Sequence, residues 1–463
     1  MAAPVCPGCH ERDARIAELE ARLLALEGQL RDLTDRLNPP PPPRTPTPQP
    51  PAPGKKPTGK NPGGQPGHPP HLKIHVPPER VNAVVPFIPR RCRSCQTPLP
   101  QMAGPGDPAP TRHQVAELPA VAAQITEYQG HYRTCPCCKQ VTHAPIPAHL
   151  RAHSVGPRLA AALSYLAGCH GVSKRGVEEI AGAVFDAPIG LGTVANLEQE
   201  MSRALTAAHQ QARAAIAAAA VKHVDETGWK QAGKKRWLWA AATARVAAFV
   251  IHPRRNVAAL KQLVGEHLTG ILCSDRWCVY DEWPVLRRQV CWAHLKRNWE
   301  KQAERGGKAA VVGRACLGVE RRVFELWHLF RGGGCTRGEM DERMVPLILE
   351  LLEVLRAGRR SRDRKLSRFC ARILGVYAAL WTFVVEEGVE PTNNHAERMQ
   401  RRAVLWRRRS FGCHSAAGCR FVERVLTAVQ TLRLQNRSVL EFLYKAVQAH
   451  RGGLQVPRLV EAG

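Results

Sequence analysis

The spacing of apolar residues changes several times along the chain, and each change predicts a different structural element. From Ile16 to Leu37 the apolar positions alternate steps of three and four residues, which is the a/d pattern of a coiled coil. Arginine and glutamate residues flank this seam and would pair between two parallel helices. We therefore predict that residues 1–38 form a leucine-zipper coiled coil that holds the protein in a homodimer or higher oligomer. An amphipathic helix packed on its own chain is the alternative.

A proline-rich basic linker is predicted for residues 39–78. It begins with the unbroken run Pro39–Pro43, and lysine and glycine join the prolines near its end. Prolines at this density favour extended polyproline II, which makes a semi-rigid spacer. The cations of the linker could follow a phosphate backbone or could simply be solvated, and the sequence leaves both interpretations open.

Helical and strand-like patterns alternate through the rest of the chain. Residues 151–215 have helical periodicity, with a turn containing glycine and proline before a helix from Thr193 to about Leu205. This arrangement is typical of a helix-turn-helix, whose second helix can enter the major groove, but a plain helical hairpin has the same pattern. Between about 220 and 300, strand-like runs surround one helix-like segment. The strand-like runs are Trp237–Ala242, Val246–Ile251, Leu268–Ser274 and Arg288–Trp292, and the helix-like segment is Asn256–Glu266.

These patterns predict a multidomain α/β protein. At 463 residues the chain is long enough for about two to four folding units. We assign a mixed sheet with helices to residues 216–435, with a helical insertion at about 300–385 that breaks at Gly332–Gly334. A helical tail is predicted for residues 436–463.

Charge narrows the classes of partner. The chain has 67 Lys and Arg against 39 Asp and Glu, which gives a net charge of +28. This excess favours a polyanion such as DNA, with a basic membrane-surface protein as the competing interpretation. No apolar run is long enough to span a bilayer, and the first residues lack the apolar core of a signal peptide. We therefore expect a cytoplasmic, nucleoid-associated protein without a membrane partner.

Two CxxC pairs within residues 79–150 predict a small zinc-binding module. Four thiolates are the number that a tetrahedral structural Zn²⁺ needs, and such a site leaves no open position for catalysis. Cys137 is an alternative ligand, because the sequence Cys-Pro-Cys-Cys allows two pairings. Redox use is the competing interpretation, but one CxxC would suffice for it and no βαβ pattern surrounds either pair. The predicted ligands are Cys92, Cys95, Cys135 and Cys138.

A third CxxC pair lies near the start of the chain, at Cys6 and Cys9. In a parallel coiled-coil dimer the two copies of this pair would lie side by side and could share one zinc ion. A disordered tip is the alternative. The pair also fits the CxxCH form of haem attachment, an interpretation we reject because both export and a haem pocket are lacking.

Three acidic residues in the second half of the chain are candidates for catalysis. Asp225 and Asp275 each end an apolar run, and Glu397 lies in a polar, helix-like stretch. Two carboxylates at strand ends and one on a helix can hold two divalent cations, Mg²⁺ or Mn²⁺, beside a phosphodiester. Any one of these acids alone would more often be a capping or solvated residue. The rival ligands nearby in the sequence are Glu226, Asp281 and Glu282.

Arginines follow the third acid closely. Cations at a catalytic edge position phosphates without reading sequence, although a charge run is usually just a solvated face. Trp406 and Phe411 are available to stack on an unpaired base, but a tryptophan at helical spacing more often belongs to a core. The predicted DNA-binding residues are Arg398, Arg401, Arg402, Arg407, Arg408 and Arg409.

Four short motifs stand out in the chain: residues 62–68 (Pro-Gly-Gly-Gln-Pro-Gly-His), 224–227 (Val-Asp-Glu-Thr), 291–294 (Cys-Trp-Ala-His) and 392–398 (Thr-Asn-Asn-His-Ala-Glu-Arg). With the zipper and the zinc module, these motifs resemble bacterial insertion-sequence transposases of the DDE type, in particular the IS66 family. The resemblance covers nearly the whole chain. Two positions depart from the family pattern: Thr392 stands where an Asp is usual, and Arg276-Trp277 stands where Gly-Tyr commonly follows the second acid.

The resemblance implies a ribonuclease H-like catalytic core with a helical insertion between the second and third acids. It makes Asp225, Asp275 and Glu397 the catalytic triad and the ligands of two Mg²⁺ or Mn²⁺ ions. Similar Cys/His pairs follow the second acid in several DDE transposases, so Cys291 and His294 are auxiliary candidates. His294 could contact the scissile phosphate, or the pair could be structural.

The expected function is that of a DNA transposase, which cleaves transposon ends and joins their 3′ ends to target DNA by two-metal phosphoryl transfer. Its partners would be double-stranded DNA (terminal inverted repeats and target), further copies of the chain and companion element-encoded proteins. Two alternatives stay open at this point. One is a catalytically inactive, transposase-derived regulator that binds DNA, and the other is a ribonuclease H-like nuclease without strand transfer.

Overall fold

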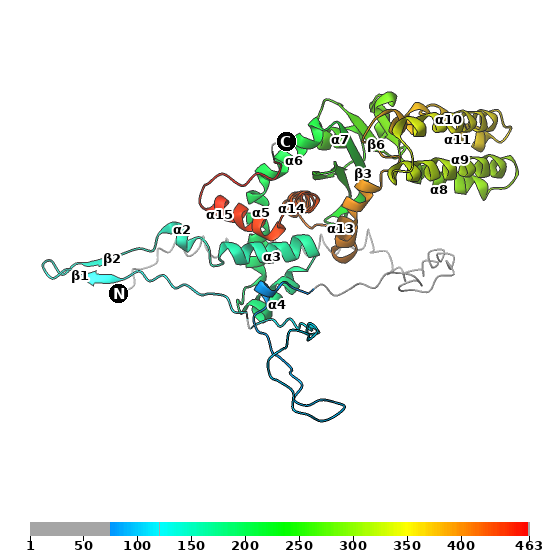
Figure 1. Cartoon of the computed structure of the whole chain (residues 1–463). Coiled ribbons are helices and arrows are strands. Elements are labelled where there is room, and N and C mark those ends of the chain that lie inside the picture. Colours follow the sequence, from blue (N-terminus) through cyan, green and yellow to red (C-terminus); the bar gives the residue numbers. More distant parts are fainter. Residues whose placement is uncertain (1–74, 120, 462–463) are drawn as a thin grey trace, which may run out of the picture. The chain divides into compact units, whose positions relative to one another are not determined.

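A computed structural model describes residues 75–119 and 121–461 of the chain. The chain divides into two compact units, residues 1–116 and 117–463. The predicted coiled coil, almost all of the predicted linker, and the pair Cys6 and Cys9 lie outside the described residues. The larger unit contains the main sheet and nearly all of the described helices (Figure 1).

A five-stranded mixed sheet is the centre of the larger unit, in the order β5-β4-β3-β6-β7. Strands β3, β4 and β5 form an antiparallel meander, whereas β6 pairs parallel with β3 and β7 pairs parallel with β6. The predicted mixed sheet is confirmed, and all four strand-like runs form strands. The strands are β3 Val221–Gln231, β4 Lys234–Ala242, β5 Ala247–His252, β6 Ile271–Ser274 and β7 Arg288–Val290.

Both faces of the sheet are buried under helices. Along β4, Trp239 and Ala241 belong to one hydrophobic cluster, whereas Leu238 and Ala240 belong to another. This alternation follows from the two-residue period of a strand. The first face packs against α6 and α7, and the second against α13 and α14. These helices are α6 Thr206–Ala218, α7 Val257–Val264, α13 Asn394–Ser410 and α14 Ala416–Leu434.

Helix α14 satisfies the free edge of β5. The backbone N–H groups of alternate β5 residues donate to side chains four residues apart on α14. Two strand residues advance roughly 6.8 Å and four helical residues roughly 6.0 Å, so the two spacings nearly match. The edge is therefore closed to strand addition. The pairs are Ala247 with Thr431, Phe249 with Thr427, and Ile251 with Glu423, at 3.0, 3.1 and 2.6 Å.

The helices before the sheet share its largest hydrophobic cluster, which runs from Val155 to Leu459. Helix α15 (Val439–Arg451) from the C-terminal end packs on α3 and α5. The predicted two-helix pattern is present as α4, a turn and α5, with Val177 and Ala181 buried on α4. Arg451, at the end of α15, donates hydrogen bonds to both carboxylate oxygens of Glu200 on α5, at 2.8 Å each. The first helices are α3 Pro157–His170, α4 Lys174–Phe185 and α5 Leu191–Ala204.

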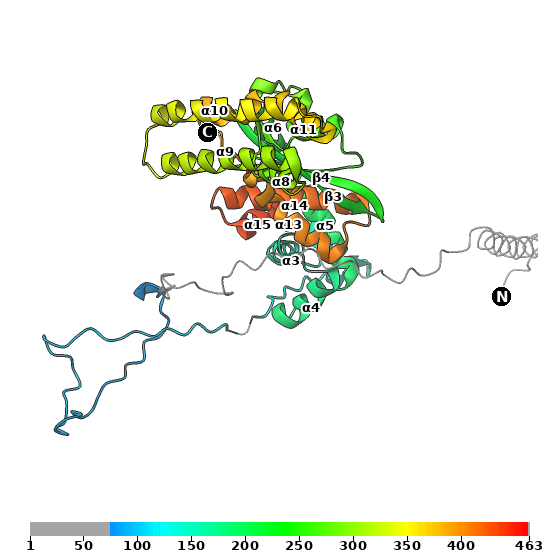
Figure 2. The same cartoon turned by 90° about the vertical axis from the view of Figure 1, so that its right-hand side faces the viewer.

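The helical insertion has a hydrophobic cluster of its own. Its helices lie side by side on the β7 side of the sheet (Figures 1 and 2). The break at Gly332–Gly334 separates the two longest helices, and Thr336 with Glu339 forms a capping box at the start of the second. Trp292 and Val290 extend this cluster into the sheet. The helices are α8 Trp292–Ala303, α9 Gly307–Arg331, α10 Arg337–Arg359, α11 Arg364–Leu374 and α12 Thr382–Val385.

The two CxxC pairs form the same local turn, and they lie in different compact units. In each turn the N–H of the residue after the second cysteine donates to the carbonyl of the first, at 3.0 Å. That residue is Gln96 or Lys139, and each has a φ of 62°. The described residues before α3 otherwise contain only short elements, η1 Pro78–Arg80, β1 Tyr132–Thr134, β2 Val141–His143 and α2 Ala148–Arg151.

Candidate active site

The three predicted catalytic acids line one cavity of about 390 Å³ in the larger unit. Asp225 comes from β3, Asp275 from the residue after β6, and Glu397 from the first turn of α13. Strand pairing explains the first two positions, because β6 lies beside β3 in the sheet. The remaining lining residues include a histidine and two arginines. They are Glu226, Thr227, Arg255, His294, Arg297, Gln400 and Val404.

Asp225 lies within β3, and the prediction that it ends a strand is wrong. Strand β3 continues to Gln231 because residues 223–231 pair with β4 on the other side. The parallel pairing with β6 ends at His223, so Asp225 lies just beyond it. Burial, followed by the charges of Glu226, Asp275 and Glu397, raises the pKa of Asp225 to about 8. Asp275 and Glu397 are therefore close enough to Asp225 to disfavour its charged form.

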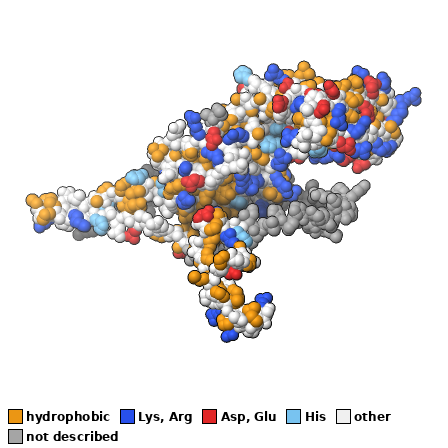
Figure 3. Space-filling view, in the orientation of Figure 1, with side chains coloured by type: hydrophobic (Ala, Val, Ile, Leu, Met, Phe, Trp, Pro, Cys, Tyr) orange, Lys and Arg blue, Asp and Glu red, His pale blue; other side chains and the backbone are white. Residues whose placement is uncertain are grey.

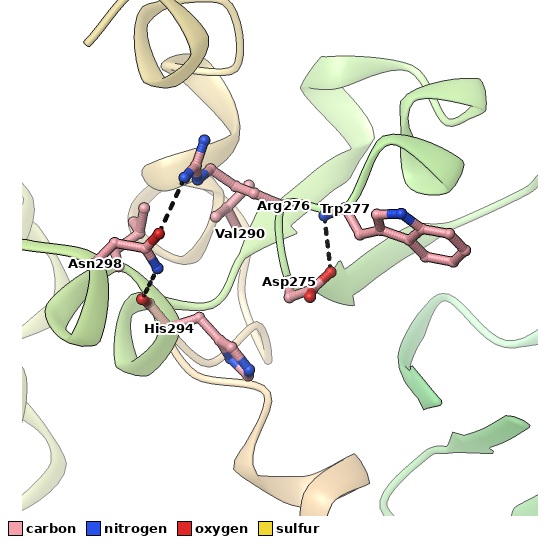
Figure 4. Close-up of a pocket in the computed structure, with 7 residues that line it drawn as sticks. Asp275, Arg276, Trp277, Val290, His294 and Asn298 are labelled. Atoms are coloured by element: carbon pink, nitrogen blue, oxygen red, sulfur yellow. Dashed lines mark hydrogen bonds between the residues drawn. The ribbon is translucent and has the colours of Figure 1, made fainter. Parts of the chain in front are cut away.

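Asp275 directly follows β6, as predicted, and is fixed by the turn after it. The backbone N–H of Trp277 donates to Oδ1 of Asp275 at 2.8 Å (Figure 4). The guanidinium of Arg255 lies 3.7 Å from the centre of the Trp277 ring, which holds the indole in place. A second cavity of about 210 Å³ lies on this side of Asp275, lined also by Arg276 and Asn298.

Two side chains of α8 lie beside Glu397. Arg297 donates from Nη2 to Oε1 of Glu397 at 3.3 Å. His294 Nδ1 lies 3.6 Å from the same oxygen. Sequence reasoning missed Arg297. Its position three residues after His294, on the same helical face, is the signal that could have identified it.

His294 and Cys291 have different positions, although they were predicted as a pair. His294 lines both cavities, and its Nδ1 is buried without a hydrogen-bond partner among the described residues. Burial, followed by the charge of Arg297, lowers the pKa of His294. Cys291 is buried outside both cavities, and its Sγ accepts from the N–H of Asn393 at 3.1 Å. Cys291 is thus a positioning residue for the chain entering α13.

Asn393 joins the strand of the first acid to the helix of the third. Its Nδ2 donates to the carbonyl of Val224 at 2.7 Å, and its Oδ1 lies 3.1 Å from Nδ1 of His223. The side chain is 1% exposed, so these bonds are shielded from water. Val224 immediately precedes Asp225, and Asn393 is four residues before Glu397. The sequence motif contained Asn393, but only the fold assigns it this bridging position.

The rival acids are engaged elsewhere or lie outside the cavity. Glu226 lines the cavity, but Arg255 and the hydroxyl of Tyr280 both donate to its carboxylate. Asp281 accepts from Arg288 at 2.7 Å and does not line the cavity, and the exposed Glu282 does not line it either. The geometry thus favours Asp225 and Asp275 over these neighbours.

Within residues 75–119 and 121–461, no three His, Cys, Asp or Glu side chains are grouped closely enough to hold a metal ion as they stand. The three catalytic candidates therefore line the cavity without converging on one point.

The predicted zinc ligands lie in two local turns that are formed in the structure, and hydrogen bonds lower the pKa values of two of their thiols. The Thr97 hydroxyl has the largest effect on Cys95, and the N–H of Cys138 on Cys135. Zinc binding stays a prediction.

The six predicted DNA-binding arginines fall into two groups on α13. Three of them donate to main-chain carbonyls of neighbouring elements and help to hold the fold. These are Arg402 to Cys169 (3.0 Å), Arg409 to His170 (3.1 Å) and Arg407 to Gly228. The other three are exposed, and Arg398 lies 3.3 Å from Nδ1 of His395. The exposed three are Arg398, Arg401 and Arg408.

Comparisons with known proteins place the chain in a family. Within the described part of the chain, no helix is long and apolar enough to cross a membrane. A search of curated proteins found no match. A comparison with protein families matches residues 153–420 to the family described as "Transposase IS66 family", and the match spans the three acids and the helical insertion. Since it covers more than half of the sequence, the chain belongs to the IS66 family of transposases.

Proposed function

We propose that the protein is a DDE transposase that cleaves transposon ends and joins their 3′ ends to target DNA. The observation that carries this proposal is the common cavity of Asp225, Asp275 and Glu397 in a chain of this family. These acids come from two neighbouring strands and one helix, separated by 50 and 122 residues in the sequence. Such a convergence of distant acids in one polar cavity favours catalysis over a set of unrelated surface residues.

A ribonuclease H-like core is part of the proposal. Three antiparallel strands followed by two parallel strands, in the order β5-β4-β3-β6-β7, support this assignment. The first acid on the central β3 and the second after the adjacent β6 also suit such a core. The helical insertion between β7 and α13 separates the third acid from the second in sequence but not in the fold.

The donor set of the cavity fits divalent Mg²⁺ or Mn²⁺. Both ions prefer carboxylate oxygens, and the neighbouring carboxylates that, after burial, raise the pKa of Asp225 supply negative charge for a cation to offset. Asp225, Asp275 and Glu397 would hold two ions, with Glu397 exchanging its bond to Arg297 for the metal. When bound, the ions activate the attacking oxygen and stabilise the leaving 3′ oxygen.

The chain's own residues prepare the cavity for a phosphodiester. Arg297 is 55% exposed at its rim and has further N–H donors available for a phosphate oxygen. His294 lines the cavity with Asp275 and Glu397, and its Nδ1 lies 3.6 Å from Oε1 of Glu397. Asn393 and Cys291 hold β3, α8 and α13 in position relative to one another. The exposed arginines of α13 extend the cationic surface along which duplex DNA would lie.

The remaining parts of the chain are proposed to serve assembly and docking. Two cysteine turns of one geometry, with thiol pKa values lowered by hydrogen bonds, support a structural zinc held by Cys92, Cys95, Cys135 and Cys138. The coiled coil would hold two or more copies on paired ends. Companion element-encoded proteins are part of the same proposal.

Charge-neutral substitutions of the three acids test this function. Asp225→Asn, Asp275→Asn and Glu397→Gln should each abolish Mg²⁺-dependent cleavage of end-containing DNA while DNA binding persists. Glu325→Gln, at an exposed acid of the insertion, is the matched control and should cut like the wild type. Cleavage by all three variants would refute the assignment. Pre-cut ends distinguish the alternatives, since a nuclease without strand transfer leaves them unjoined and a regulator neither cuts nor joins.

A further inference from the structure

Phe411 is presented to solvent at the C-terminal end of α13. Its side chain is 74% exposed. Its backbone φ of 57° lies in the left-handed region, which a bulky residue adopts only at a cost in free energy. Trp406, the other aromatic residue near the arginines, instead packs on Phe421 with ring centroids 6.2 Å apart. Of these two aromatic residues, Phe411 is therefore the one available to a partner.

Phe411 is the left-handed C-cap of α13, and the residues that follow it are bound to the β3–β4 hairpin. The N–H of Phe411 donates to the carbonyl of Arg407 at 2.8 Å, and the N–H of Cys413 donates to the carbonyl of Lys230 at 2.9 Å. A side chain at Gly412 would collide with that same Lys230 carbonyl, so the loop and the hairpin fit closely. The backbone that carries the ring is thus fixed beside the hairpin.

The surface around Phe411 is strongly cationic. Residues 398–422 contain seven arginines and no Asp or Glu. Residues 228–246 of the hairpin contain five Lys and Arg and again no acid. Lys and Arg side chains gather over α13 in Figure 3. DNA is a partner that can bind both features. Its phosphates would contact the cations, and a base would stack on the exposed ring.

Phe411 lies along a continuous surface that starts at the catalytic cavity. Glu397 and Phe411 are fourteen residues apart on α13, which corresponds to about 21 Å along the helix. Arg407 ties this helix to β3 by donating to Oγ1 of Thr227 at 3.1 Å. Beyond Gly228 the hairpin continues past the strands that flank it, since β6 pairs only through residue 223 (Figure 2). At 3.4 Å per base pair, 21 Å corresponds to roughly six base pairs of duplex.

We propose that Phe411 stacks on a base of DNA bound along α13, roughly six base pairs from the cleaved bond, and distorts the duplex there. This inference rests on the proposed function, because it takes the cavity as the place of cleavage. Stacking of an aromatic ring on a base corresponds to roughly a 5- to 150-fold gain in affinity. The strained backbone at Phe411 is then the cost of holding the ring in the path of the DNA.

Fluorescence of 2-aminopurine tests this placement. The probe is a duplex carrying the terminal sequence that flanks the gene, with 2-aminopurine placed singly at each of the first ten positions. With the full-length wild type, the signal should change most near position six. Phe411→Ala should remove that change and weaken binding about 5-fold or more, and Phe411→Leu should retain part of it. Val345→Ala, at an exposed apolar residue of α10, is the matched control and should behave like the wild type.

Two further variants separate stacking from charge and from folding. Arg408→Ala should reduce the salt dependence of binding by about one unit of slope, whereas Phe411→Ala should leave that slope unchanged. Phe411→Gly should melt at the same or a higher temperature than the wild type, because glycine accepts the positive φ, and should still lose the fluorescence change. An unaltered signal and affinity in Phe411→Ala would overturn this inference alone. Failure of the wild type to bind end-containing DNA at all would overturn the proposed function with it.

Discussion

The carboxylate cavity and the two cysteine turns differ in how far apart along the chain their parts lie. The cavity is lined from β3, the loop before α7, the residue after β6, α8 and α13, and Asn393 reaches across 169 residues to Val224 to join α13 to β3. Each cysteine turn is complete within residues 92–97 or 135–140 and is closed by its own backbone hydrogen bonds. A local turn can form before the rest of the chain folds, whereas the cavity exists only when the sheet and helices have packed.

This difference predicts separate vulnerabilities. Any loss of packing between β3, α8 and α13 should disturb the carboxylates, because each acid is placed by a different element. Loss of a zinc ligand should affect the cysteine turns and leave the sheet unchanged. The two kinds of site should therefore respond independently to substitution, pH and chelation.

Asn393→Ala should have the largest effect, because it removes the bridge between the strand of Asp225 and the helix of Glu397. The buried carbonyl of Val224 and the ring of His223 would each lose a partner, at a cost of about 1–3 kcal/mol per group. Cleavage should fall below detection, and denaturant unfolding should report the loss of stability. Asn394→Ala, at the exposed neighbour, is the control. Wild-type cleavage by Asn393→Ala would show that the bridge does not position the acids.

Asp225 should make a contribution of defined sign to the pH dependence of stability. Its pKa of about 8 in the folded protein lies above its ordinary value, so the folded state binds the extra proton between about pH 4 and pH 8. The stability contributed by this proton is present at low pH and is lost as the pH rises through 8. Asp225→Asn should remove this dependence and stabilise the metal-free protein at pH 8 by on the order of a few kcal/mol.

Thermal melts at pH 5 and pH 8 measure this effect. Addition of Mg²⁺ at pH 8 should stabilise the wild type, since the cation offsets the repulsion among the carboxylates, and should stabilise Asp225→Asn much less. A melting-temperature difference between Asp225→Asn and the wild type that is the same at the two pH values would contradict the raised pKa. A smaller contrast is expected for Asp275→Asn, which removes one of the repelling charges and leaves Asp225 buried.

Chelation of zinc should act on the cysteine turns and leave the cavity intact. The full-length protein should contain one zinc per chain, and Cys135→Ser should reduce this content. Limited proteolysis should then cut faster before about residue 150, while the fragment beginning near α3 resists and keeps its melting temperature. A drop in the melting temperature of that fragment would show that the turns and the sheet are coupled. Absence of zinc from the wild type would refute the module itself.

Arg297→Ala is the substitution from which we expect the smallest effect, and this effect should fall on Mg²⁺ binding. Its bond to Glu397 is exposed and long, at 3.3 Å, so its removal should tighten Mg²⁺ binding only about 2- to 5-fold. Cleavage should nevertheless slow, because a phosphate-binding cation is lost. Arg297→Lys should restore part of the rate without bidentate geometry. Weaker Mg²⁺ binding in Arg297→Ala would show that the arginine orders Glu397 for the metal.

Short-range patterns in the sequence predicted the helices and strands, but not the contacts between them. Apolar runs identified four strands of the sheet, and helical periodicity identified the insertion with its break at Gly332–Gly334. The boundary of β3 was wrong because its second half is defined by pairing with β4, which a single-strand pattern does not contain. Polar strand residues such as Glu226 are explained by partners far along the chain.

The acids were predicted from motifs, whereas the groups around them depend on tertiary structure. Arg297 and Asn393 are ordinary polar residues by composition, and their roles follow only from the packing of α8 and α13 against β3. The six arginines looked equivalent in sequence. In the structure three of them donate hydrogen bonds to main-chain carbonyls. Which three do so depends on the elements that pack against α13.

Iron-mediated backbone cleavage tests most directly whether the three acids form one metal site. Fe²⁺ bound in place of Mg²⁺ generates radicals that cut the chain near its ligands. For the full-length protein with Fe²⁺, ascorbate and peroxide, fragment ends should cluster near residues 225, 275 and 397 and disappear with excess Mg²⁺. Cuts that omit one of these three positions, or that persist in excess Mg²⁺, would contradict the proposed active site.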